Sequence, residues 1–249
     1  KLLRQGHYRA AQYELKKARR AAANMVNHHS LDVERVDYLE AMSVAALGRD
    51  TLALGGYLAT YPNSIHSDEV RYALACEFFE LELWQRAVEC FAEVDTDRLS
   101  EEQMEEWCFK YGFAAHRLGD NATARDLLLR VDGRGVRGDH AKYLLGYIAY
   151  TEDYLLDARL HFASLSESKE YGGLVPYYLF NIEHRLGNNR YVADRAEGVL
   201  EGLKGGRRAE VMRLAAQSCF ALEEWERAAD YVARMESEGE TLSRQENYL

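Results

Sequence analysis

Apolar and polar residues recur along most of the chain with the three- and four-residue spacing of amphipathic helices. Within this pattern a short block repeats: a polar or glycine turn, an aromatic residue, an alanine, and a bulky apolar residue four positions later. Trp84, Ala87 and Phe91 form a clear copy. A period near 34 residues predicts a stack of similar helical units. The alanine-type positions of the block are Ala11, Ala53, Ala87, Ala124, Ala158, Val192 and Ala228.

A second series of marks precedes the five middle blocks and predicts the first helix of a pair. Its aromatic members are Tyr38, Tyr72, Phe109, Tyr143 and Tyr177, separated by 34, 37, 34 and 34 residues. Small residues stand three positions after the first four of them, at Ala41, Ala75, Gly112 and Gly146, whereas the fifth copy has Phe180. We expect the small residues to let neighbouring helices approach closely.

These marks predict antiparallel helix pairs that bury their apolar faces by stacking. A glycine such as Gly119 suits the left-handed residue that ends a helix, and alanine suits a close helix crossing. We expect a capping box at Ser100 and Gln103 and a helix cap at Ser67. The predicted fold is all-α, with about seven pairs near residues 1–28, 30–60, 67–94, 101–131, 138–165, 174–202 and 207–236, the first of them incomplete.

The sequence resembles the tetratricopeptide repeat (TPR) family over essentially its whole length. The residues that carry the resemblance are Ala75, Phe78, Trp84, Ala87, Phe91, Gly112, Gly119, Ala124, Leu128, Gly146, Ala158 and Phe162. Val192 and Arg213 depart from the family pattern. The resemblance implies a single array over 1–249, an α-solenoid with a right-handed superhelix and a concave inner surface lined by the first helices.

A narrower similarity lies in residues 143–150 and 171–178, together with His161 and Phe162. These stretches resemble long TPR proteins common in Bacteroidetes, which are mostly periplasmic or associated with the cell envelope. The resemblance therefore implies a cell-envelope location, with a cytoplasmic one as the alternative. Because the chain begins at Lys1 and ends in a polar tail, we expect a fragment of a longer protein, whose exposed repeat ends could self-associate.

The composition agrees with a helical repeat and disfavours several functions. The 249 residues include only two prolines, and the formal net charge is −10, which disfavours binding to phosphate backbones. No run of apolar residues is long enough to span a membrane. The four cysteines have no metal-ligand spacing, and we expect them to be small buried apolar residues. They are Cys76, Cys90, Cys108 and Cys219.

Patterns that could carry catalysis or bind a metal are weak. His28 and His29 are adjacent and would point about 100° apart on a helix. The acidic run at 101–106 opens a helix, where carboxylates suit the helix dipole. The glycines at 133, 135 and 138 match GxGxxG but follow no predicted strand, so we expect a loop. The sequence thus predicts no enzyme, no cofactor and no metal site.

The expected function is that of a non-catalytic scaffold, which binds a protein or peptide on the concave face and helps to assemble a larger complex. The alternatives are the regulatory or sensor arm of an enzyme or signalling protein whose catalytic domain lies outside this segment, and a passive spacer. Some of the projected aromatics could instead pack only between adjacent pairs. Positions four and seven residues apart share a helix face, and this spacing gives the candidate contacts Tyr72, Phe79, Phe109, Phe113, His116, Arg117, Tyr143, Tyr147, Tyr150, Tyr177, Asn181, His184, Arg185 and Gln217.

Overall fold

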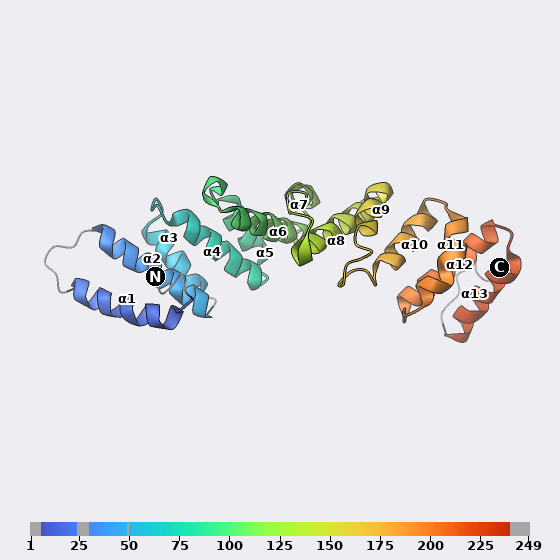
Figure 1. Cartoon of the computed structure of the whole chain (residues 1–249), viewed down its shortest axis with the longest axis horizontal. Helices are drawn as coiled ribbons and strands as arrows, with labels where there is room; N and C mark the ends of the chain where they lie inside the picture. The colour runs from blue at the N-terminus through green and yellow to red at the C-terminus, as the bar shows by residue number, and fades with distance from the viewer. Residues whose placement is uncertain (1–5, 24–29, 49, 240–249) are drawn as a thin grey trace. The chain divides into compact units, whose positions relative to one another are not determined.

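The computed structural model of the chain describes residues 6–23, 30–48 and 50–239. These residues form thirteen α-helices and one short 3-10 helix and contain no β-strand (Figure 1). The all-α prediction is therefore confirmed. His28, His29 and the end of the polar tail, residues 240–249, lie outside the described residues.

The helices group into two compact units, Lys1–Val131 and Asp132–Leu249. The first unit contains α1 (Tyr8–Ala23), α2 (Ser30–Gly48), α3 (Thr51–Thr60), α4 (Ser67–Glu80), α5 (Trp84–Ala92), the 3-10 helix η2 (Thr96–Arg98), α6 (Glu101–Arg117) and α7 (Asn121–Leu128). The second unit contains α8 (Gly135–Thr151), α9 (Leu155–Ala163), α10 (Val175–Arg185), α11 (Asn189–Leu200), α12 (Gly206–Ala221) and α13 (Trp225–Ser237).

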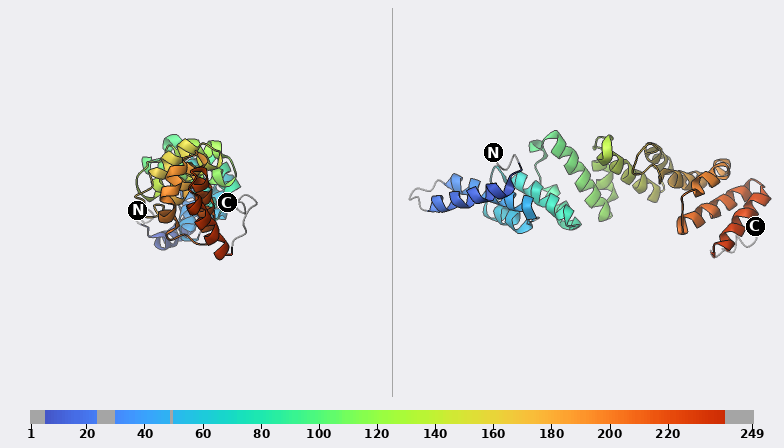
Figure 2. Two further views of the ribbon diagram at one scale, coloured as in Figure 1. Left: turned by 90° about the vertical axis from the view of Figure 1, so that its right-hand side faces the viewer. Right: turned by 60° about the horizontal axis from the view of Figure 1, so that its bottom comes forward.

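Within each unit, consecutive helices form pairs that pack on one another, as α12 and α13 do in Figures 1 and 2. The pairs α2–α3, α4–α5 and α6–α7 of the first unit, and α8–α9, α10–α11 and α12–α13 of the second, match six of the predicted pairs. In the interval predicted for the incomplete first pair, the described residues hold the single helix α1, which packs on α2.

The turn inside a pair has the same backbone geometry in the five pairs whose turn lies wholly within the described residues. The residue after the helix cap has a left-handed conformation, and the next residue donates its N–H to a carbonyl five positions earlier, as Leu83 does to Phe78 over 2.9 Å. Glycine is therefore not required at this turn, although it avoids steric strain there. The left-handed residues are Glu82 (φ 56), Gly119 (φ 86), Asp153 (φ 68), Gly187 (φ 78) and Glu223 (φ 62).

Exchanging the residue types at these turns gives a testable result. An L-residue with a side chain costs about 1 kcal/mol or more in the left-handed region. We expect Glu82→Gly to raise the free energy of unfolding by about 0.5–1 kcal/mol, and Gly119→Ala to lower it by about 1 kcal/mol or more. Urea unfolding followed by circular dichroism measures both variants. A change of the same sign in both would contradict this account of the turn.

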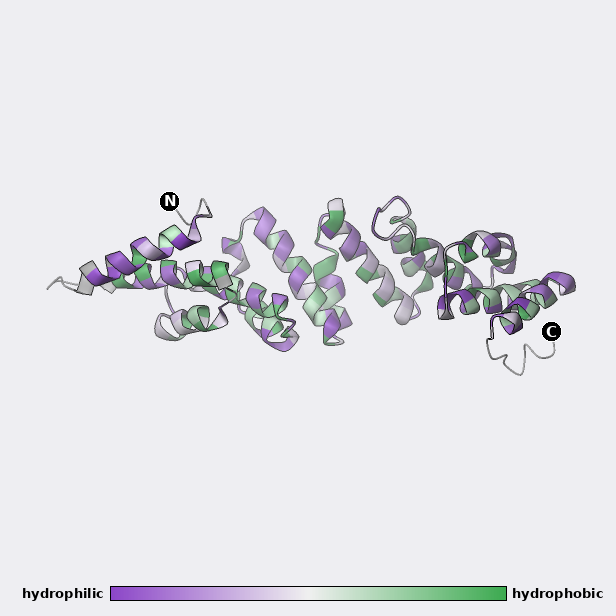
Figure 3. Cartoon of the chain, turned by 90° about the horizontal axis from the view of Figure 1, so that it is seen from below, coloured by the Kyte–Doolittle hydropathy of each residue, from purple (hydrophilic) through white to green (hydrophobic). Residues whose placement is uncertain are grey.

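The alanine and glycine marks lie at tight helix crossings, as predicted. Among the alanine-type positions Ala53 is half-buried and the rest are buried, and the bulky partners Phe91 and Phe162 are fully buried. A methyl group at Gly112 would lie 3.0 Å from Leu128, and one at Gly146 would lie 3.2 Å from Phe162. Figure 3 shows hydrophobic and hydrophilic residues on different sides of the helices.

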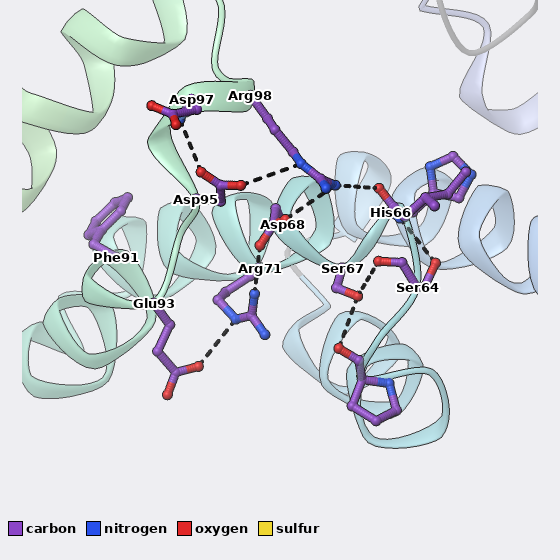
Figure 4. Close-up of polar contacts among 12 residues, drawn as sticks. Ser64, His66, Ser67, Asp68, Arg71, Phe91, Glu93, Asp95, Asp97 and Arg98 are labelled. Atoms are coloured by element: carbon purple, nitrogen blue, oxygen red, sulfur yellow. Dashed lines mark hydrogen bonds and ion pairs between the residues drawn. The ribbon is translucent and has the colours of Figure 1, made fainter.

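The capping box at the start of α6 is confirmed, because Ser100 and Gln103 bond each other's backbone N–H. The predicted cap at Ser67 is wrong. Ser67 is the first residue of α4 and is buried, and its hydroxyl donates 2.6 Å back to the carbonyl of Ser64 (Figure 4). A serine inside the first turn bonds the preceding loop instead of a free helix N–H.

The loop predicted for the glycine run is correct for Gly133 but wrong for Gly135 and Gly138, because α8 begins at Gly135 rather than after Gly138. Gly138 is buried in the first turn of that helix, where the loop at Asp132 and Gly133 folds back against it. Gly138 thus serves a close backbone contact between the helix and the preceding loop.

A chain of ion pairs links the two inter-pair loops of the first unit. Arg98 of η2 donates to the carbonyl of Ile65 over 3.3 Å and lies 3.4 Å from Asp68 (Figure 4). Asp68 also pairs with Arg71 over 2.9 Å, and Arg71 pairs with Glu93 over 3.2 Å. The pairs that involve the exposed side chains of Arg98 and Glu93 each contribute less than about 1 kcal/mol.

Candidate functional site

Four rings gather on α4, α5 and α6 of the first unit. Phe79 of α4 and Phe113 of α6 lie edge to face with centroids 5.5 Å apart, and Trp84 lies 5.4 Å from Phe79 and 5.6 Å from Phe113. Phe109, one turn earlier on α6, lies 6.3 Å from Phe113. All four rings are half-buried, so each retains an accessible part. We call these residues the first-unit aromatic cluster.

Two cations border the first-unit aromatic cluster. The Lys110 ammonium lies 5.4 Å from the Phe79 ring centre, and the Arg117 guanidinium lies 5.5 Å from that of Trp84. Such contacts contribute about 0.5–1 kcal/mol each at exposed sites. Lys110 also pairs with Glu80 over 3.3 Å and with Glu106 over 2.9 Å. A partner that reaches this cluster meets an aromatic surface bordered by Arg117 on one side and by Lys110 with its two carboxylate partners on another.

Two predicted contacts of the first unit have packing partners of their own. Tyr72 is buried between α4 and α6, where its hydroxyl donates to Glu106 over 2.9 Å. Burial is the first cause that raises the Tyr72 pKa above its usual value, so this side chain keeps its proton. The imidazole of His116 is half-buried and hydrogen-bonds to Asn121 over 2.9 Å. Tyr72 therefore serves packing between pairs rather than partner contact.

The second unit carries a tyrosine cluster centred on Tyr143 of α8. The Tyr143 ring stacks on Tyr171 at 4.5 Å, and its hydroxyl lies 2.9 Å from that of Tyr178. Tyr147 stacks on Tyr143 at 6.4 Å and is itself exposed. Burial raises the pKa of Tyr171 to about 12. The side of this cluster that faces the core is buried, and Tyr147 lies on the side that faces solvent.

Arg185 at the end of α10 occupies the same repeat position as Arg117, eight residues after an aromatic mark. Its guanidinium lies 4.8 Å from the Tyr150 ring centre of the preceding pair, and it pairs with Asp153 over 2.6 Å. Arg117 covers Trp84 of its own preceding pair in the same way. An arginine from the following first helix thus caps an aromatic of the pair before it in both units.

Tyr177 of α10 makes, in the second unit, a tyrosine–carboxylate contact like that of Tyr72. Its hydroxyl donates to Glu210 of α12 over 2.5 Å, and the Arg207 guanidinium lies 5.3 Å from its ring centre. Burial, followed by the bond to Glu210, raises the Tyr177 pKa above its usual value. The half-buried Tyr177 ring packs against its neighbours and also keeps one edge accessible.

The remaining predicted contacts differ in access. Asn181 is buried, and its amide donates to the carbonyl of Tyr177 over 3.0 Å, so it is not offered to a partner. His184 is half-buried, and burial lowers its pKa, which favours the neutral imidazole. Gln217 on α12 is half-buried.

Sequence reasoning missed several residues of these clusters. Trp84 was identified only as a turn mark, although its ring completes the first-unit aromatic cluster. Tyr171 comes from an irregular segment between α9 and α10, where helical spacing carries no signal. Lys110 follows Phe109 directly, and its long side chain reaches back to Phe79, a contact that only the structure reveals.

Within the described part of the chain, no group of three or more histidine, cysteine, aspartate or glutamate side chains could hold a metal ion. In the same residues, no helix has both the length and the apolar character needed to cross a membrane. The four cysteines are free thiols, and burial is the first cause that raises the pKa of each.

No protein-family model and no curated protein matches the chain. Among solved structures it is similar to a tetratricopeptide repeat protein from Parabacteroides merdae ATCC 43184, with 16% sequence identity and a TM-score of 0.49. That match covers 95% of this chain and 88% of the other. The repeat architecture described above rests on the chain's own helix pairs and turns.

Proposed function

We propose that the chain is a non-catalytic scaffold that binds a protein or peptide partner on its first helices and thereby helps to assemble a larger complex. The proposed contacts are half-buried or exposed side chains of the first helices: Phe79, Phe109, Phe113 and Arg117 in the first unit, and Tyr147, Tyr150, Tyr177 and Arg185 in the second. Tyr72 and Asn181 are left out because they are buried.

The supporting observation is that rings and arginines recur together at the accessible edge of first helices in both units. Aromatic residues and arginine are the side chains most enriched at binding hot spots. Tyr147 stacks on Tyr143 and nevertheless remains exposed, so its ring is accessible to a partner. An extended or helical peptide could use such edges as anchor points for apolar side chains.

The test is affinity capture from a lysate of the source organism with the intact chain and with the double variant Phe109→Ala, Tyr147→Ala. We expect the intact chain to retain at least one protein. The double variant should retain about tenfold less of that protein, or lower still, which is the loss typical of a hot spot. Mass spectrometry identifies the retained proteins.

The matched control is Leu156→Ala, Leu160→Ala on α9, which removes two exposed apolar side chains from a second helix. This variant should retain the same proteins as the intact chain. Equal retention by the Phe109, Tyr147 variant, with its helical circular dichroism unchanged, would refute the proposed surface.

A further inference from the structure

One face of α1 carries a stripe of positive charge. Arg9, Lys16 and Arg20 follow one another at seven and four residues, so they share a face of the helix. Lys17 lies beside them, and Tyr13 stands among them with 70% of its surface exposed. All four cations are exposed, and within the described part of the chain no acidic side chain pairs with them. We call these five residues the α1 basic stripe.

The other side of α1 fixes the direction in which the basic stripe points. Ala11 is buried, and α1 packs on α2 (Figure 1). Arg19 pairs with Asp37 over 2.6 Å and with Glu40 over 2.8 Å, and both carboxylates belong to α2. The cation on the α2 side is therefore used inside the unit, whereas the basic stripe faces solvent.

The exposure of the basic stripe follows from its place in the repeat. Two of its members stand two residues before and two residues after the alanine-type mark Ala11. The same two positions are exposed in second helices that have described helix pairs on both sides. They are Gln85 and Glu89 in α5, and Arg190 and Asp194 in α11. This face of a second helix thus remains open to solvent when neighbouring pairs are stacked on it.

The charge of this outer face separates α1 from the second helices of the six pairs. Four outer positions, two before the alanine-type mark and two, five and six after it, carry a net charge of +3 on α1. The same four positions carry −2 on α5, −1 on α11 and α13, and 0 on α3, α7 and α9. Because neutral and acidic outer faces serve the same packing in six pairs, the fold does not require cations at these positions.

We propose that the α1 basic stripe is a docking site for an acidic helix of a partner protein, whose carboxylates recur every three or four residues along one face. Such carboxylates would face the cations of the stripe one helical turn after another. Arginine binds carboxylates through two parallel hydrogen bonds, and Tyr13 adds an exposed ring of the kind enriched at binding hot spots.

The charges of the first unit favour a narrow acidic partner over a broad one. A nucleic-acid duplex or an anionic membrane extends well beyond one helix, and it would also meet the neutral outer face of α3 and the acidic outer face of α5. A single helix would cover the basic stripe alone. This site is separate from the first-helix contacts proposed above and does not depend on them.

The probe is a fluorescently labelled, stapled, alanine-rich peptide of about 18 residues, long enough to run along the stripe, with glutamates every three or four residues on one face. Fluorescence anisotropy at about 50 mM salt, where screening is weak, measures its binding to the full 249-residue chain. We expect saturable binding that weakens about tenfold or more in the variant Arg9→Gln, Lys16→Gln, Arg20→Gln. Because the three side chains are exposed, this variant should keep the helical circular dichroism of the intact chain.

The matched control is Arg130→Gln, Lys169→Gln, Lys204→Gln, which removes three exposed cations from other places in the chain. It changes the net charge equally and should leave peptide affinity within about twofold. Carbodiimide, which joins a carboxylate to a lysine amine, provides a second readout. Mass spectrometry should locate the crosslinks to the peptide glutamates at Lys16 or Lys17.

Absence of saturable binding would overturn the proposal, and so would an equal loss of affinity in both triple variants. Single-stranded oligothymidine and phosphatidylcholine vesicles with about 30% phosphatidylserine test the other anionic partners. Tighter binding of either one, lost in the α1 variant, would replace the acidic helix by that partner. A dimer in sedimentation that becomes monomeric in the α1 variant would show that a second copy covers the stripe. None of these outcomes depends on the Phe109, Tyr147 surface.

Discussion

Replacing Phe162 with alanine is expected to lower the free energy of unfolding of the second unit by about 3–5 kcal/mol, the range for large buried aromatics. Phe162 on α9 is fully buried. Its ring stacks on Tyr178 at 4.3 Å with an interplanar angle of 3°, and it meets Tyr143 edge to face at 6.0 Å. The substitution removes apolar area and leaves a cavity beside Gly146, which packs directly on this ring.

Leu160→Ala on the same helix is the control, because Leu160 is 68% exposed and its truncation should change stability by about 0.5 kcal/mol or less. Chemical unfolding gives the free energies, and hydrogen exchange measured by mass spectrometry locates the loss. Exchange should accelerate in α8, α9 and α10. Similar losses from both variants would mean that Phe162 is not a core anchor.

The helix pairs could be predicted from sequence because their determinants are local and repeat. A close crossing excludes large side chains, so alanine or glycine returns at nearly the same interval, as Ala87, Ala124 and Ala158 show. The turn was recognisable as polar, but its left-handed residue was not, since Glu82 and Asp153 adopt the conformation usually reserved for glycine. Hydrogen bonds of the turn impose that conformation whatever the side chain.

The candidate surface was predicted less completely because its residues depend on neighbours about 34 positions away. Spacing places Tyr72 and Tyr147 on comparable helix faces, yet Tyr72 is buried against Glu106 while Tyr147 is exposed. The distinction depends on how closely the following first helix approaches, which one helix's periodicity does not encode. The prediction that Asn181 contacts a partner is wrong for the same reason, since Asn181 is buried inside the second unit.

Replacing Gly138 with alanine is expected to lower the free energy of unfolding of the second unit by about 1–3 kcal/mol, the usual cost of an overpacked site. A methyl group there would lie 2.4 Å from the carbonyl carbon of Gly133 and 2.5 Å from the carbonyl oxygen of Asp132. Both obstacles are backbone atoms, so the clash cannot be relieved by rotating a side chain. Lys142, one turn later, donates to the Gly133 carbonyl and holds the same loop in place.

Gly198→Ala in α11 is the matched control, since a methyl group at Gly198 meets no atom within 4 Å. In a helix interior alanine is better than glycine by about 0.5–1 kcal/mol, so this variant should stabilise the unit. Alanine also has the higher intrinsic helix preference than glycine at position 138, inside the first turn of α8. A loss at Gly138 together with a gain at Gly198 would therefore show that backbone contact, not helix propensity, selects the glycine. A gain at both positions would place the loop at 132–134 away from α8.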